Sequence, residues 1–318
     1  MGILSLFLNY KSMKKTVLSK LLWLICICVV SGLYSLQSHA RQKAKVLIVT
    51  GQNNHNWKVS HLAIQKILDN SGLFTADIAI SPAKGEDMSA FSPDFSSYKL
   101  VVVDYNGDLW SEKMQENFLD YVQNGGGVVI YHAANNSFPQ WKAYNEICAL
   151  GGWEGRNEKD GPYAYWKDGR LTKDSSDGLG GSHGEQREYV LTARDNGHPI
   201  MKGLPHTWKH AKDELYDRMR GPANIATLMF TAFALPEKGG SGREEPLVFT
   251  VDYGKARIFH IMLGHAGDTL EDNPAMQCTG FQVLLLRGAE WAATGKVTQK
   301  VPADFPTEKE VSYRKEYK

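Results

Sequence analysis

Short, mostly apolar runs recur through the first half of this chain. They cover residues 45–50, 76–80, 99–104 and 128–131. A strand whose two faces are both buried needs such a run, whereas a strand with one solvated face alternates apolar and polar residues. Between the runs, apolar residues recur at helical spacing over 59–68 and 114–122. Strands alternating with helices of this length predict βαβ units and a parallel sheet.

The second half has a different pattern. It predicts strands over 188–193 and 225–234, a hairpin over 246–262 and an amphipathic closing helix over 277–292. The stretch 153–184 is rich in Gly, Asp, Lys and aromatic residues and lacks periodicity. A loop of this length is usually functional or mobile.

The N-terminus has the pattern of a secretory signal. Four lysines and no acidic residue accompany an apolar run over 21–33, and small residues lead to Ala40. Residues 1–40 are therefore predicted to be a signal peptide cleaved after Ala40, and the protein is expected to be exported, to the periplasm or beyond the cell. Translation begins at Met1 or, if the basic segment has ordinary length, at Met13.

The alternative is a membrane anchor. The apolar run is shorter than the roughly 20 residues that a transmembrane helix needs, so we expect no stable span after cleavage. Ile precedes both Cys26 and Cys28, which argues against a lipoprotein signal. Without the leader, the chain has 32 basic and 35 acidic residues, which gives a net charge of −3. A weakly acidic chain without a basic cluster is a poor partner for nucleic acid. The remaining Cys148 and Cys278 either pair or, as is commoner for cysteine, lie buried as free thiols.

Polar loops follow the predicted strands. Because ligands of open parallel sheets bind beyond the carboxyl ends of the strands, these loops are the expected site. His55, His132 and His265 lie in three of them, and a packed sheet has no structural need for imidazoles there. The candidates for substrate contact are His55, Trp57, Asp104, Asn106, Asn135 and, from the aperiodic stretch, His183.

A second group is His206, His210 and Glu214. Spaced by four, they would line one face of a helix and bind a divalent metal, the one cofactor that these residues suggest. Pro205 and weak periodicity speak against a continuous helix, and the alternative is a loop whose His and Glu bond locally or contact substrate. Glu214 is the best general acid or base in this half.

Several established motifs are missing. The sequence has no Gly-x-Ser-x-Gly elbow and no Cys at a strand-to-helix turn, so an acyl-enzyme mechanism lacks a nucleophile. No glycine-rich stretch matches a dinucleotide or phosphate-binding fingerprint, and 125–127 is interpreted as a helix stop. Tryptophans and tyrosines near the polar loops suit carbohydrate rings, although any single one is more often part of the core.

Several ordered motifs carry a family resemblance. They are His55-Asn56-Trp57, the run 125–134 ending in Tyr-His-Ala-Ala, His198-Pro199-Ile200, Asp213-Glu214-Leu215-Tyr216, the turn 253–257 and Leu263-Gly264-His265. Together they resemble the ThuA-like (trehalose utilisation) family of the class I glutamine amidotransferase-like superfamily, over about residues 45–294. Ala256 departs from the usual Gly of the turn, which affects local geometry only.

The resemblance implies a fold and a substrate class. The fold is a flavodoxin-like three-layer α/β sandwich with a mostly parallel central sheet, in which His132 replaces the nucleophilic Cys of amidotransferases. The domains would be a signal peptide (1–40), a ThuA-like domain (41–296) and a charged, loosely held tail (297–318). The suggested substrates are oxidised sugars, 3-keto-glycosides such as 3-ketotrehalose.

Three functions remain open. The first is an enzyme of carbohydrate utilisation that performs elimination, isomerisation or hydration on a sugar or keto-sugar, because a ketone acidifies the neighbouring C–H bond. His132 and His265 would be acid and base, Glu214 a base or metal ligand, and His55 with Asp104 would orient the small-molecule substrate. The alternatives are a hydrolase or amidotransferase-like enzyme with another nucleophile, and a non-catalytic carbohydrate-binding protein.

Overall fold

The computed structural model describes residues 42–317, and Lys43 onwards belongs to one compact unit. The predicted signal peptide, residues 1–40, lies outside the described residues. Within the described part of the chain, no helix is long and apolar enough to cross a membrane.

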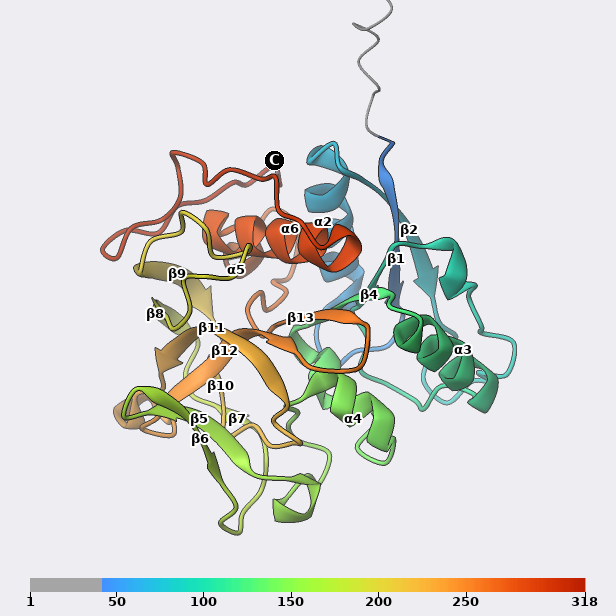
Figure 1. Ribbon diagram of the computed structural model, residues 1–318, viewed down its shortest axis with the longest axis horizontal. Coiled ribbons are helices and arrows are strands. Elements are labelled where there is room, and N and C mark those ends of the chain that lie inside the picture. The colour runs from blue at the N-terminus through green and yellow to red at the C-terminus, as the bar shows by residue number, and fades with distance from the viewer. Residues whose placement is uncertain (1–41, 318) are drawn as a thin grey trace, which may run out of the picture. The chain divides into compact units, whose positions relative to one another are not determined.

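Five parallel strands form one half of the sheet (Figure 1). They are β1 (Ala44–Thr50), β2 (Phe74–Ile80), β3 (Leu100–Val103), β4 (Gly127–Tyr131) and β13 (Arg257–Ile261). Their order is β2-β1-β3-β4-β13, the doubly wound order of flavodoxin-like folds. Burial of both faces of β3 and β4 explains their apolar runs and confirms the predicted α/β fold.

Helices cover both faces of these strands. Figure 1 shows α2 (Trp57–Asn70) and α6 (Thr279–Thr294) together on one face, and α3 (Glu112–Gln123) and α4 (Lys142–Cys148) on the other. The short α5 (Pro274–Gln277) precedes α6. A cluster of aromatic rings, which includes Trp110, Phe118 and Tyr144, packs between α3 and α4. The predicted helix stop is confirmed by Gly125, which has φ +90° just after α3.

Antiparallel strands extend the sheet beyond β13. They are β12 (Glu244–Val251), β11 (Ile225–Phe233), β8 (Arg187–Ala193) and β9 (Thr207–Asp213). The stretch 153–184 contains a hairpin of β5 (Tyr163–Lys167) and β6 (Arg170–Asp174), and β5 pairs with β12. A separate short pair joins β7 (Ser182–His183) to β10 (Tyr216–Asp217). This stretch is therefore folded and is not a structureless loop.

Strand β9 corrects the prediction of a helix through His206, His210 and Glu214. Residues 207–213 pair with β8, and the Trp208 and His210 side chains point into the core, both fully buried. Side chains that alternate between inward and outward are typical of a strand. The sequence does not show this alternation, because some of the inward residues are polar.

The segment after Thr294 is packed against the domain, which corrects the expectation of a loose tail. The Lys209 amide donates to the Thr307 carbonyl at 2.8 Å, and the rings of Phe305 and Trp208 lie 5.4 Å apart. Tyr317 is 2% exposed. Cys148 and Cys278 are both buried and free, as expected for core thiols.

Candidate functional site

Three loops bring three histidines together at the carboxyl edge of the parallel strands. His55 follows β1, His132 follows β4 and His265 follows β13. The ring centres of His55 lie 4.7 Å from His132 and 4.8 Å from His265, and His132 and His265 are 5.8 Å apart. The predicted convergence of these imidazoles is confirmed.

Glu214 lies at the centre of this group, although it comes from the antiparallel half of the sheet. Its Oε2 lies 3.2 Å from His55 Nε2 and 3.6 Å from His132 Nε2. Its Oε1 lies 3.3 Å from His265 Nε2 and 3.7 Å from His183 Nε2. Each oxygen of this carboxylate therefore faces two of the four imidazoles.

His132 is held by its backbone and by both ring nitrogens. Its φ of +45° is strained for a residue with a side chain, and it turns the chain sharply from β4 into the 3₁₀ helix η2 (His132–Asn136). Its Nδ1 lies 2.6 Å from the Met262 carbonyl, which can only accept, so Nδ1 carries a proton. Its Nε2 faces Glu214 and lies 3.1 Å from the Tyr216 hydroxyl.

Asp213 ties the two halves of the site together. Its Oδ1 accepts from the Glu214 amide at 2.7 Å and from the His265 amide at 3.0 Å. Its Oδ2 accepts from the Gly264 amide at 2.7 Å and lies 2.7 Å from His210 Nε2. Gly264 has φ +100°, and a Cβ there would clash with Phe281, so glycine is required. The buried carboxylate thereby sets the positions of Glu214 and His265.

Burial and neighbouring charges shift the pKa values of the titratable groups of the site in different directions. Burial lowers the pKa of His55 to about 4 against the opposing effect of Glu214, and burial with the neighbouring His132 lowers the pKa of His265. For His132, burial is outweighed by Glu214 and Asp213, which raise its pKa. For Glu214, burial is outweighed by His132 and His55, so the pKa of the carboxyl falls far below its ordinary value. Neighbouring titratable groups whose pKa values are shifted in opposite directions are typical of acid/base sites.

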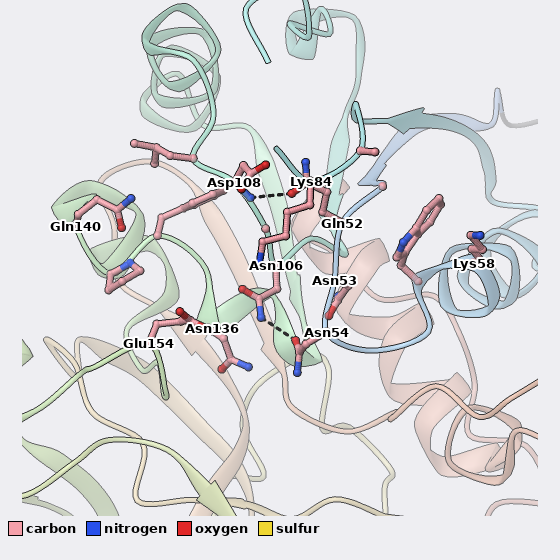
Figure 2. Close-up of a pocket in the computed structure, with 17 residues that line it drawn as sticks. Gln52, Asn53, Asn54, Lys58, Lys84, Asn106, Asp108, Asn136, Gln140 and Glu154 are labelled. Atoms are coloured by element: carbon pink, nitrogen blue, oxygen red, sulfur yellow. Dashed lines mark hydrogen bonds between the residues drawn. The ribbon is translucent and has the colours of Figure 1, made fainter. Parts of the chain in front are cut away.

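One cavity opens at the histidines, and a second, larger cavity adjoins it. The first, of about 440 Å³, is lined by Glu214, Tyr216, Trp153 and the imidazoles of His55, His183 and His265. The other, of about 670 Å³, is lined by polar groups and Trp57 and is drawn in Figure 2. Asn54, Asn106, Asn136 and Glu154 line both cavities, so the two form a continuous cleft.

The floor of the larger cavity is held by amides. Figure 2 shows Asn106 pointing to Asn54, and its Nδ2 donates to Asn54 Oδ1 at 2.7 Å. The Asp108 amide donates to Gln52 Oε1 at 2.8 Å. Such a surface of fixed amide and carboxylate groups suits a ligand with many hydroxyls.

Two predicted substrate contacts are wrong. Asp104 is fully buried beneath the site, where it accepts from Ser60 Oγ at 2.6 Å and from Asn53 Nδ2 at 3.4 Å. Asn135 is also fully buried, with its amide 3.1 Å from His260 Nε2. The tight turn of η2 directs Asn135 inward, and Asn136 lines the cleft instead.

The predicted metal ligands are not brought together either. His206 is exposed before β9, and His210 bonds with Asp213 inside the core, away from the cleft. Within residues 42–317, the group of His, Cys, Asp or Glu residues with ligand atoms close enough for one ion is His55, His132 and Glu214, whose ligand atoms lie within 4.8 Å of one another. Asp213, Tyr216, Trp153 and Asn136 were missed, although the first two lie in the motif around Glu214.

No conventional acyl-transfer nucleophile faces the imidazoles from the described residues. Burial raises the pKa of the Cys148 thiol to about 12, against the opposing effects of Arg156 and Tyr144. The Ser137 hydroxyl donates to the Tyr105 carbonyl at 2.6 Å and is buried. The position after β4 that would carry a nucleophile holds His132.

The strand order is that of a flavodoxin-like fold, and His132 occupies the sharp turn after β4. The family model described as ThuA, trehalose utilisation, matches residues 45–292, so the chain belongs to this family. It is similar to a ThuA-like protein from Parabacteroides merdae, with 70% identity, a TM-score of 0.87, and coverage of 87% of this chain and 99% of that one.

A ThuA-like protein from Bacteroides uniformis shares the fold, with 18% identity, a TM-score of 0.50, and coverage of 80% of this chain and 93% of that one. No curated protein matches the chain significantly.

Proposed function

We propose that this trehalose-utilisation family protein is an enzyme that performs acid/base chemistry on a sugar or 3-keto-glycoside. The observation that carries the proposal is the buried Glu214 carboxylate, within 3.7 Å of four imidazoles at the wall of a polar cleft. Amide and carboxylate groups alone can bind hydroxyls, whereas four imidazoles around one carboxylate are suited to proton transfer.

His265 is the proposed base. Its imidazole is 25% exposed and faces the cleft, while Glu214 Oε1 at 3.3 Å and the Asp213 bond to its amide hold it in place. It would take the proton from the carbon beside the ketone, and the electron pair would move onto the ketone oxygen to give an enolate. Elimination and isomerisation share this step, and hydration of the resulting enone passes through the same enolate in the opposite direction, with a proton returned to carbon. In the elimination, the enolate collapses, the glycosidic C–O bond breaks, and the departing oxygen takes a proton.

The other residues of the cleft would bind and orient the sugar. Asn106 and Asn136 line both cavities, and His55 lines the smaller one. Trp57 presents an aromatic face in the larger cavity and Trp153 in the smaller. His132 does not line the smaller cavity, so it would act through Glu214 and Tyr216 and not by touching substrate. Two adjoining cavities match a glycoside with two parts, the oxidised ring beside the imidazoles and the second sugar beside Trp57.

The test is incubation of purified protein with 3-ketotrehalose and simpler 3-keto-glucosides, followed by mass spectrometry of the products. We expect conversion of at least one of them, lost in Glu214→Gln. Failure to convert any oxidised sugar would overturn the enzyme proposal. Tight binding without conversion, unchanged in His265→Gln, would instead favour a carbohydrate-binding protein, which the aromatic and amide lining of the larger cavity would also serve.

Export is part of the proposal and rests on the N-terminal sequence pattern alone. N-terminal sequencing of the protein recovered from the periplasm or medium should begin at Arg41. Recovery of an uncleaved chain from the cytoplasm would contradict it.

A further inference from the structure

The two oxygens of Glu214 have different surroundings. His55 Nε2 and His132 Nε2 face Oε2, whereas His183 and His265 face Oε1. From this division we propose that His55 Nε2, His132 Nε2 and Glu214 Oε2 form the ligand set of a divalent transition metal ion. The site is independent of which sugar the protein takes.

The distances from the two nitrogens to the carboxylate oxygen fit such an ion. With metal–ligand bonds of about 2.0–2.1 Å, tetrahedral ligand atoms lie about 3.3 Å apart. The two nitrogens lie 3.2 Å and 3.6 Å from Oε2, and all three ligand atoms lie within 4.8 Å of one another. Two imidazoles and a carboxylate are the donor set of catalytic zinc and non-haem iron sites, which keep further positions open.

The surroundings of His132 are those of a metal ligand. Metal-bound histidines usually donate the other ring N–H to a carbonyl or carboxylate, which orients the ring. His132 Nδ1 makes this contact with the Met262 carbonyl at 2.6 Å and leaves Nε2 to face Oε2. The strained backbone of His132 and its buried ring fix this direction before any ion binds.

The open side of the ion would face the smaller cavity, which His55 and Glu214 both line. A carbonyl or hydroxyl oxygen of a ligand could reach it there, with His265 and His183 on the far side of the carboxylate. An ion in this position would act as a Lewis acid toward that oxygen.

The test is calorimetric titration of chelator-treated protein with Zn²⁺, with metal content checked by mass spectrometry. We expect one ion per chain in the wild type. His55→Gln, His132→Gln and Glu214→Gln should each weaken binding by more than about 100-fold, above the loss expected from an outer-sphere contact. His206→Gln, which changes an exposed histidine outside the cluster, should bind one ion with unchanged affinity.

Circular dichroism establishes that each variant is folded, and Co²⁺ absorption provides a second readout through the ligand field of the intact site. Absence of stoichiometric binding, or equal binding by folded His55→Gln and wild type, would overturn the metal site. Turnover of a keto-sugar by the chelated protein would leave the enzyme proposal standing without the metal. Stoichiometric metal binding without turnover of any keto-sugar would leave the metal site standing without the enzyme proposal.

Discussion

The parallel and antiparallel halves of the sheet contribute differently to the cleft. The parallel half supplies His55, His132 and His265, each from the loop that leaves a buried strand. The antiparallel half supplies Glu214, and the β7–β10 pair adds His183 and Tyr216. Three imidazoles alone would have no common partner. The carboxylate from the added half gathers them, so the extension turns the strand ends of a common fold into an organised polar centre.

The largest expected effect comes from removing the contribution of the antiparallel half. Glu214→Gln keeps the side-chain volume but removes the charge that four imidazoles share, so turnover of a keto-glycoside should fall by about 10²–10⁴-fold. Steady-state kinetics on the folded variant measures this. Retention of most of the wild-type rate would show that the histidines of the parallel half suffice.

Substitution of the two buried aspartates, Asp213 and Asp104, compares how the two halves of the sheet contribute to the free energy of unfolding. Asp213 accepts hydrogen bonds from three backbone amides and bonds with His210. Asp213→Asn would place an NH₂ group against these donors and should lower the free energy of unfolding by about 3–5 kcal/mol. Burial raises the pKa of Asp104 to about 7, despite opposing hydrogen bonds from Ser60 and other side chains. Asp104→Asn resembles its protonated form and should cost less than about 1.5 kcal/mol.

Urea denaturation of both variants at pH 7 measures the difference. Equal losses would contradict the view that Asp213 is the link between the halves and Asp104 a local support beneath β1 and β3.

The pH dependence of stability sharpens the same comparison. For His210, burial is outweighed by Cys278 and Asp213, which raise its pKa to about 9 from 6.5. A raised pKa stabilises the fold fully below pH 6.5, and the contribution is lost as the pH rises through 9. His210→Gln should therefore cost about 1.5–3 kcal/mol at pH 6 and clearly less at pH 9.5. A cost that does not change with pH would mean that His210 is neutral.

The smallest effect is expected at the larger cavity. Trp57→Ala removes an aromatic face and should raise KM by about 2- to 10-fold, equivalent to about 0.5–1.5 kcal/mol, with kcat little changed. Leu109→Ala, at an exposed apolar residue lining the same cavity, is the control and should change KM less. A larger rise in KM from Leu109→Ala than from Trp57→Ala would place the second sugar against Leu109 and not against Trp57.

The sequence predicted the parallel half well because its rules are local. Buried strands need apolar runs, and the loops after them meet at one edge, so His55, His132 and His265 could be placed together. Glu214 could be named but not placed, because β9 pairs over long range with β8 and its inward His210 disguises the strand pattern. The phase of a single 3₁₀ turn is not visible in sequence, so the sequence predicts Asn135 where the structure has Asn136 at the cleft.

The metal ligands could not be predicted for the same reason. Spacing by four suggested one local group of His206, His210 and Glu214, whereas the cluster in the structure joins residues 55, 132 and 214 across both halves. The packed segment after Thr294 is also held by contacts with distant residues such as Trp208, which its charged composition does not show.

The proposed function depends on removal of a proton beside a sugar ketone by the imidazoles around Glu214. The most direct measurement is proton NMR of 3-ketotrehalose incubated with the protein in D₂O, following the C–H signals beside the ketone. We expect the wild type to accelerate exchange or consumption at one of these carbons, and His265→Gln and Glu214→Gln to abolish the acceleration. Exchange at the rate of buffer alone, or equal acceleration by all three proteins, would contradict it.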